Sequence, residues 1–251
     1  MPILTNKDDI RAALRRDPVW GVYALSDLDA TLFPRTKWFV PDLTLVLDLY
    51  DTTILFSTGP GAVREALDHV TWPVHLQVQA DVLAEVARYA TVTTTKLMIR
   101  MAWNGTKSDR AASRAARRLS AEDVPALRSL YADGDATGES PDFFFPSMVT
   151  DGVFFGMDEG GSLVAAAGTH VLAREEHAAA IGNVYTRRDR RGRGFGRVVT
   201  SAVLDGLAGI GTIGLNVRAD NDAAIRMYEG LGFVRHCQFI EALATGWRET
   251  V

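Results

Sequence analysis

The stretch RRDRRGRGFGRVVT, residues 187–200, places three glycines at every second position inside a cluster of arginines, namely Gly192, Gly194 and Gly196. A nucleic-acid patch, part of a dinucleotide fingerprint and a phosphate cradle at the start of a helix would all use these residue types. The three kinds of site differ in what must follow the glycines, so the neighbouring sequence can distinguish them.

The residues on either side predict a strand before the glycines and a helix after them. AAAIGNVYT (178–186) is the predicted strand, and an apolar side chain recurs at every fourth position behind the turn, at Phe195, Val199, Val203 and Leu207. A strand, a glycine turn and a helix in this order present unpaired N–H groups and a positive dipole end to an anion. The context therefore favours a phosphate cradle.

Two phosphate-binding motifs do not fit this stretch. A P-loop needs Lys and then Ser or Thr directly after its last glycine, where this chain has Arg197 and Val198. A dinucleotide fingerprint needs G-x-G-x-x-G and an acid about 20 residues later. Here the third glycine comes one residue early, and the later region offers Asn216.

A third motif fits at two places. Residues 191–196, RGRGFG, match the Q/R-x-x-G-x-G/A motif of the GNAT superfamily of acyl-CoA-dependent N-acyltransferases. LNVRADNDAAIRMYEGLGFV (215–234) resembles the strand, Asn-containing loop and Tyr-bearing helix that follow in that family. The resemblance covers residues 183–234 and implies acetyl-CoA, or another acyl-CoA, as co-substrate.

The resemblance implies a role for each matching residue. Main-chain groups would bind the pantetheine arm and the thioester carbonyl at Val184, Tyr185 and Thr186. The pyrophosphate would be held by Arg191, Gly192, Arg193, Gly194, Phe195, Gly196 and Arg197. Asn221 would hydrogen-bond the cofactor arm, and Tyr228 would protonate the departing thiolate. A well-placed donor or acid of this kind accelerates such a reaction by roughly 100-fold or more.

Each of these residues also has a simpler interpretation. Tyr228 would be an ordinary core tyrosine on an amphipathic helix, and Asn221 would be a helix cap. The arginines and glycines would form a nucleic-acid patch, although only one aromatic residue is interleaved with them.

The general base is not evident. Many members of the family carry a glutamate at positions where this chain has Ala180 and Asn216, and neither side chain accepts a proton usefully. The ionisable candidates nearest along the chain are Glu176, His177 and His170, with water as the alternative. This gap makes a non-catalytic acyl-CoA sensor or partner-binding module the rival hypothesis.

The segment YADGDATGESPDFFFPSM (131–148) is where acceptor specificity is expected. Its acids would attract a cationic amine, and Phe143–Phe145 would line an apolar slot, although a solvated loop with a hydrophobic anchor explains both features equally well. The acids are Asp133, Asp135, Glu139 and Asp142.

Strand and helix patterns recur on both sides of a polar, basic stretch. We predict an α+β protein with two GNAT-like units in tandem, each a mixed central sheet flanked by helices. The predicted ranges are 1–105 for a degenerate N-terminal unit, 106–117 for a linker and 118–251 for the catalytic unit. The first unit has a turn at Gly59-Pro60-Gly61, but Pro60 lacks an N–H donor, so a second cofactor is not expected there.

The amino-acid composition limits the classes of partner that the protein is expected to bind. A net charge of -4 over 251 residues argues against nucleic-acid binding as the main role. One cysteine and five histidines without ligand spacing predict no metal. With no apolar run of about 18 residues, we expect no membrane span and a cytoplasmic protein. The expected acceptor is a small-molecule, protein or peptide amine, and a homodimer is compatible with the sequence.

Overall fold

The computed structural model describes residues 3–49, 51–105, 113–141 and 143–249. The chain forms two compact units. The first comprises residues 1–100, 217–221 and 235–251, and the second comprises residues 101–216 and 222–234. Strands β5, β10 and β11 each run from one unit into the other, and the chain passes between the units a fourth time at Asn221–Asp222.

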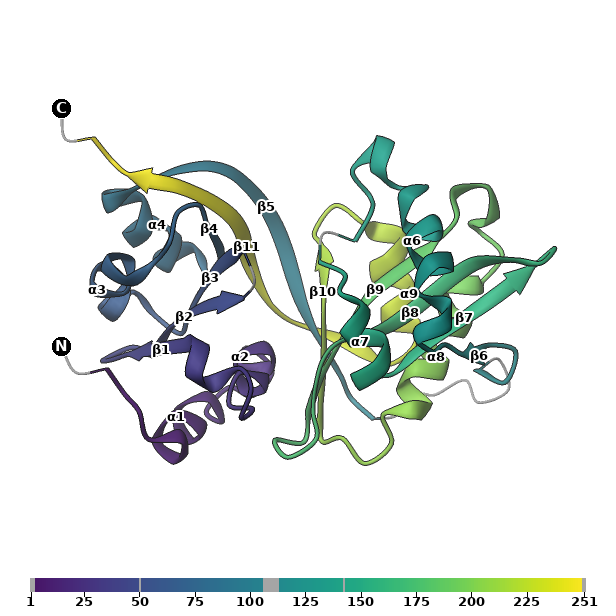
Figure 1. The fold of residues 1–251 in the computed structure, drawn as a ribbon, viewed down its shortest axis with the longest axis horizontal. Coiled ribbons are helices and arrows are strands. Elements are labelled where there is room, and N and C mark those ends of the chain that lie inside the picture. The colour runs from purple at the N-terminus through teal and green to yellow at the C-terminus, as the bar shows by residue number, and fades with distance from the viewer. Residues whose placement is uncertain (1–2, 50, 106–112, 142, 250–251) are drawn as a thin grey trace. The chain divides into compact units, whose positions relative to one another are not determined.

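The first unit contains one sheet and several short helices (Figure 1). Its strands are β1 (Thr36–Phe39), β2 (Thr44–Leu49), β3 (Thr52–Ser57), β4 (Val74–Val78), β5 (Ala90–Trp103) and β11 (Phe233–Trp247). Its α-helices are α1 (Lys7–Leu14), α2 (Val22–Ser26), α3 (Val63–Ala66) and α4 (Ala80–Tyr89), and short 3-10 helices are Phe33–Arg35, Pro60–Ala62 and Leu67–His69.

The strand order in the first unit is β1-β2-β3-β4-β11-β5. The β1–β2 and β2–β3 pairs are antiparallel, β3–β4 is parallel, and β4–β11 is antiparallel. Strand β11 therefore lies between β4 and β5, with Ile240–Ala244 opposite Val74–Val78. Ala242 and Ala244 of this strand are buried in the core formed by β2–β4, α3 and α4.

The second unit contains the glycine stretch. Its strands are β6 (Arg117–Arg118), β7 (Phe154–Glu159), β8 (Ser162–Ala173), β9 (Ala178–Thr186) and β10 (Thr212–Arg218). Its α-helices are α6 (Val124–Ala132), α7 (Pro146–Asp151), α8 (Phe195–Gly206) and α9 (Asp222–Gly230), and short 3-10 helices are Ala121–Asp123, Asp135–Thr137 and Arg188–Arg190.

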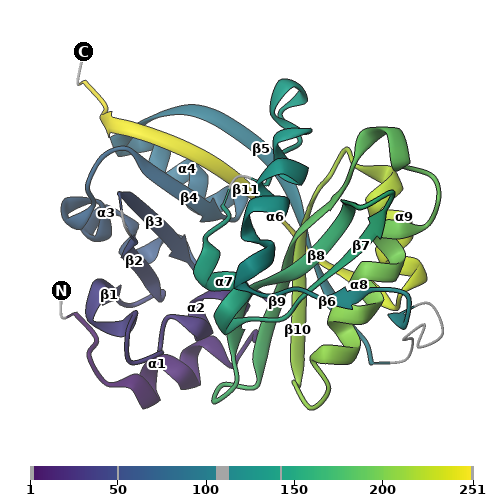
Figure 2. The same cartoon turned by 45° about the vertical axis from the view of Figure 1, so that its right-hand side comes forward.

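The sheet of the second unit has helices on both faces. Its strand order is β10-β9-β8-β7-β6, with only the β9–β10 pair parallel. Helix α8 packs on β7, β8 and β9, and α6 and α7 pack on β8 (Figure 2). Both views place α8 and α9 on one face and α6 and α7 on the other. The predicted mixed sheet flanked by helices is confirmed.

Two features of the chain differ from the expected organisation. Residues 235–251 belong to the first unit by their contacts, whereas the sequence placed all of 118–251 in the second. Residues 106–112 of the expected linker lie outside the described residues. At its end Ser113 Oγ donates to Asp205 Oδ2 of α8 at 2.6 Å, and Arg117 already pairs with Gly156 as part of β6.

Candidate active site

The glycine loop opens directly onto the first turn of α8. Gly192 and Gly194 have φ of +77° and +82°, a conformation that residues with a side chain rarely adopt. A Cβ at either position would meet no atom within 4 Å, so both glycines border open space. Phe195 and Gly196 stand in the first helical turn, where helix geometry provides no intrahelical acceptor for the N–H group. The loop has the form of an anion cradle.

Three elements come together at Gly196. A Cβ on this residue would lie 3.4 Å from Thr186 Oγ1 at the end of β9 and 4.0 Å from Met227 Cε on α9. Across the same junction, a Cβ on Gly230 of α9 would lie 2.9 Å from Arg197 Nη1. The structure thus brings the end of β9, the cradle and the helix carrying Tyr228 into one place.

The loop arginines are paired with acids of the second unit. Arg191 forms a bidentate pair with Glu139, with Nη1–Oε1 and Nη2–Oε2 distances of 3.0 and 3.1 Å, and this hydrogen-bonded contact lowers the pKa of Glu139. Arg187 pairs with Asp189 at 2.6 Å, and Arg193 pairs with Glu159 at 3.3 Å. Local acids offset much of the positive charge, which does not favour a nucleic-acid patch.

Strand β9 separates from β10 before it reaches the cradle. The described pairs with β10 run from Ala178↔Thr212 to Ile181↔Leu215, and β9 continues to Thr186 paired with β8 on its other side. Asn183 has a φ of +52°, and its carbonyl accepts a hydrogen bond from the buried Tyr131 hydroxyl at 3.0 Å. Val184–Thr186, the expected site for the pantetheine arm, are therefore free of β10 and begin directly after this bend.

Asp133 holds the end of β9 to the loop that follows. Its Oδ2 accepts from the Tyr185 hydroxyl at 2.9 Å and from the Arg188 N–H at 2.9 Å. These contacts lower the pKa of Asp133, with the Arg188 hydrogen bond as the largest cause. The sequence suggested that Asp133 and Glu139 attract a cationic amine. In the structure both carboxylates instead bind residues at the end of β9 and in the arginine-rich loop. Asp142 lies outside the described residues.

Tyr228 is buried, with 6% of its surface exposed, and its ring packs edge-on against Phe233 at 5.8 Å between centroids. Tyr228 is therefore a core tyrosine of α9, and it directly follows Met227, whose Cε would lie 4.0 Å from a Cβ on Gly196. Asn221 lies directly before α9, and its N–H donates to the carbonyl of Arg218 at 3.0 Å. Asn221 belongs by its contacts to the first unit.

The three ionisable candidates for the base lie at two places along β9, in the turn before it and beside its middle. Glu176 and His177 lie in the turn before it, where the His177 carbonyl accepts from the N–H groups of Gly211 and Thr212. That turn is roughly 16 Å along the strand from the point where β9 leaves β10, at about 3.3 Å per residue. His170 instead lies on β8 beside Gly182, close to the point where β9 leaves β10. Ala180 is fully buried within the paired part of β9.

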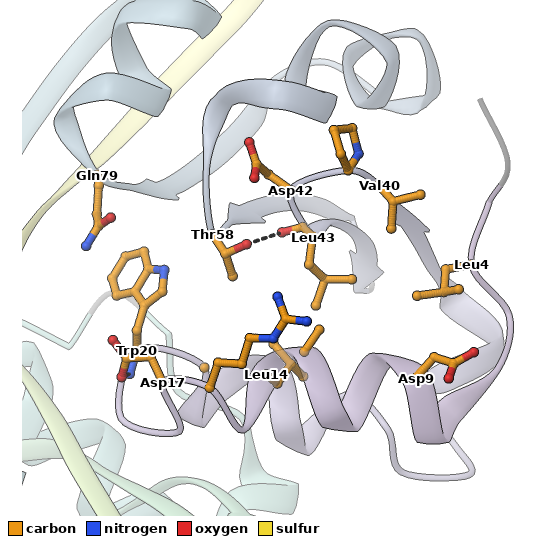
Figure 3. Close-up of a pocket in the computed structure, with 14 residues that line it drawn as sticks. Leu4, Asp9, Leu14, Asp17, Trp20, Val40, Asp42, Leu43, Thr58 and Gln79 are labelled. Atoms are coloured by element: carbon orange, nitrogen blue, oxygen red, sulfur yellow. Dashed lines mark hydrogen bonds between the residues drawn. The ribbon is translucent and has the colours of Figure 1, made fainter.

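The first unit holds a cavity of about 490 Å³ of a different character. Figure 3 shows Asp9, Asp17 and Asp42 around it, with Trp20 and Gln79 on one side. The guanidinium of Arg16 also lines this cavity, but three carboxylates against one cation leave its lining predominantly negative, which does not favour a phosphate group.

The Gly59-Pro60-Gly61 turn of the first unit contrasts with the open glycine loop of the second. Asp42 Oδ2 accepts from the Gly61 N–H at 2.8 Å, and a Cβ on Gly59 or Gly61 would lie within 2.8 Å of that carboxylate. An acid of the protein itself fills the space that an incoming anion would need. This supports the expectation that the first unit binds no second acyl-CoA.

We expect Asp42→Ala to lower the free energy of unfolding by about 1 kcal/mol, since it removes a charge-assisted hydrogen bond at a partly exposed turn. Urea denaturation would measure the change. The matched control is Asp51→Ala at the exposed β2–β3 turn, where we expect no measurable change. Equal stability of both variants would show that the Asp42 contact does not stabilise the turn.

No helix in residues 3–49, 51–105, 113–141 and 143–249 is long and apolar enough to cross a membrane. In the same residues, no three His, Cys, Asp or Glu side chains are grouped so that they could hold a metal ion.

Comparison with known proteins agrees with this geometry. The model of the acetyltransferase (GNAT) family matches residues 117–233, which contain the cradle and α9. Over 117 residues, or 46% of the chain, the sequence is 32% identical to the ribosomal protein bS18 alanine N-acetyltransferase of Escherichia coli and covers 77% of that enzyme. The chain belongs to the GNAT acetyltransferase family.

Two further comparisons extend the similarity. Mycothiol acetyltransferase of Streptomyces coelicolor is 41% identical over 88 residues, which are 33% of this chain and only 27% of that enzyme. The crystal structure of a GNAT-family protein from Novosphingobium aromaticivorans aligns with 91% of this chain and 96% of its own, with a TM-score of 0.67 and 22% identity. The latter likeness shows a common fold across both units.

Proposed function

We propose that the protein is an acetyl-CoA-dependent N-acetyltransferase of the cytoplasm whose active site lies in the second unit. The convergence of the β9 end, the open glycine loop and the Tyr228 helix on Gly196 carries this proposal. Family membership supports the reaction class, and the open space beside Gly192 and Gly194 fits a phosphate group.

Acetyl-CoA supplies the acyl group as a thioester. Backbone N–H groups of the loop and of the first turn of α8, with the positive helix end, hold the pyrophosphate. Arg191, Arg193 and Arg197 contribute charge around this cradle. The end of β9 that is not paired with β10, Val184–Thr186, offers N–H and carbonyl groups to the pantetheine arm and the thioester carbonyl.

Tyr228 protonates the sulfur as the C–S bond breaks. Its position on α9, one residue after Met227 at the cradle, supports this role. The amine nitrogen forms the new C–N bond and releases one proton to water, and Tyr228 is later reprotonated from solvent. The two protons and the bond changes balance without a covalent enzyme intermediate.

The acceptor in this proposal is a primary amine. Names of relatives support two classes, since one relative is an alanine N-acetyltransferase that acts on a ribosomal protein and another is a mycothiol acetyltransferase. An N-terminal alanine of a peptide and a small-molecule amine are therefore the first acceptors to test.

Calorimetric titration with acetyl-CoA, followed by thiol-release assays with alanine-initiated peptides and small primary amines, tests this function. We expect saturable binding and amine-dependent thiol release. Binding without release for any amine would favour the rival, a non-catalytic acyl-CoA sensor or partner-binding module. Absence of binding in moderate salt would contradict both.

A further inference from the structure

Strand β9 contains a β-bulge at Asn183. The register of β9 against β8 shifts between Ala166 and Gly168. Two residues of β9, Asn183 and Val184, therefore lie opposite one residue of β8, and Asn183 adopts the positive φ of +52°. Bulges redirect side chains and are frequent beside active sites. The Asn183 side chain thus leaves the regular alternation of the strand directly before the segment proposed to bind the thioester.

The Asn183 side chain lies among apolar groups of α6 and α7. Its Nδ2 donates to Met148 Sδ on α7 at 3.4 Å, and its main-chain carbonyl accepts from the Tyr131 hydroxyl on α6 at 3.0 Å. The Tyr131 ring packs against Phe144, with 5.1 Å between the ring centroids, and Met148 packs against the same core cluster. Asn183 therefore faces α6, α7 and the segment between them, where the sequence predicted acceptor specificity.

The amide of Asn183 is buried but has an oxygen that an outside molecule can reach. Only 7% of the residue's surface is exposed, and the thioether that Nδ2 contacts is a weak acceptor. No residue in the described part of the chain donates a hydrogen bond to Oδ1. Among the described residues, Oδ1 is also not one of the fully enclosed side-chain atoms without a partner. An incoming N–H group can therefore hydrogen-bond to this oxygen.

From this placement we propose that the side-chain carbonyl of Asn183 binds the acceptor amine. The inference rests on the proposed acetyltransferase function and names a residue that holds its second substrate. Oδ1 accepts one N–H of the neutral amine and directs the nitrogen lone pair at the thioester carbon beside Val184–Thr186. The amide takes no proton, so the proton that the amine loses still goes to water. The cradle at the start of α8 lies on the other face of the sheet from α6 and α7 (Figure 2), so the two substrates approach β9 from different faces.

A role confined to the backbone would give a different result on substitution. Asparagine adopts a positive φ more readily than most residues with a side chain, so the residue type alone would suit the bulge. Glycine adopts the same conformation without steric cost. The change Asn183→Gly therefore keeps the backbone of the bulge and removes the amide, which separates the two roles.

The test measures steady-state thiol release from acetyl-CoA by Asn183→Gly, with the primary amine that the wild type uses fastest. We expect kcat/KM for the amine to fall about tenfold, or about 1.4 kcal/mol, through loss of one hydrogen bond. The Kd for acetyl-CoA, measured by calorimetry, should not change. The matched control is His177→Gly, since His177 also has a positive φ, of +51°, but lies in the turn before β9. We expect this control to retain the wild-type kcat/KM.

Asn183→Asp provides a second test, because it keeps an acceptor oxygen and loses only the donor to Met148. We expect it to retain most of the wild-type kcat/KM for the amine. A wild-type kcat/KM in Asn183→Gly, or equal losses in Asn183→Gly and Asn183→Asp, would overturn the role of the Asn183 oxygen. Neither result would affect the proposed function, which fails only if the wild-type protein itself transfers no acetyl group.

Discussion

Gly194→Glu is expected to weaken acetyl-CoA binding about 1000-fold. The new carboxylate would stand at the mouth of the cradle, where a Cβ has open space around it, and would repel the pyrophosphate. Two like charges about 4 Å apart at an effective dielectric constant near 20 repel by roughly 4 kcal/mol, and every 1.4 kcal/mol corresponds to a tenfold change in affinity. Calorimetric titration with acetyl-CoA measures the loss.

The backbone conformation contributes a second, smaller cost that must be separated from the charge. Gly194 has a φ of +82°, and a non-glycine residue in this region costs roughly 1–2 kcal/mol. Gly209→Glu is the matched control, since Gly209 has a φ of +90° and equally open surroundings beyond the end of α8. We expect similar losses of thermal stability in the two variants, but normal affinity in Gly209→Glu. Equal affinities in both would contradict the cradle.

Local sequence patterns predicted which segments form strands and helices better than they predicted which strands pair with one another. The strand predicted at 178–186 and the apolar face predicted for the helix after the glycines are both present. The pairing of Ile240–Ala244 with Val74–Val78 joins segments more than 160 residues apart in sequence. Alternation within β11 shows that a strand exists, but it contains no information about which strand it joins.

The first helix was not predicted, although the N-terminal residues contain a helix-start signal. Asn6 caps α1, and its side-chain oxygen accepts from the N–H groups of Asp8 and Asp9. The cap and the acids of the first turn are typical of a helix start. The helix has only eight residues, so periodicity alone gave little indication of it.

The candidate site likewise contains residues that a local pattern predicts and residues that only the fold brings together. Gly192, Gly194 and Gly196 were found because the requirement for free N–H groups is local to one turn. The pairing of Glu139 with Arg191 and the contact of Asn183 with α7 depend on which segments the fold places together. No spacing along the chain shows that a bulge lies at Asn183, because a bulge is defined by the register of two strands.

Tyr228→Phe is expected to lower kcat about 100-fold, the loss typical when a positioned acid is removed. Phenylalanine keeps the edge-on packing against Phe233, so the change removes little besides the hydroxyl. Stability should therefore fall by no more than about 1 kcal/mol, and the Kd for acetyl-CoA should not change. Steady-state kinetics with thermal unfolding and calorimetry separate these three quantities.

The control for this change is Tyr89→Phe on α4 of the first unit, where loss of a hydroxyl should leave kcat unaltered. If Tyr228→Phe also retained the wild-type kcat, the proton for the thiolate would have to come from another donor, and Tyr228 would be only a core residue. If instead affinity for acetyl-CoA fell with kcat, the hydroxyl would act in binding the thioester. A selective loss of kcat is the result that a proton donor to the leaving thiolate requires, because the hydroxyl then contributes only as the C–S bond breaks.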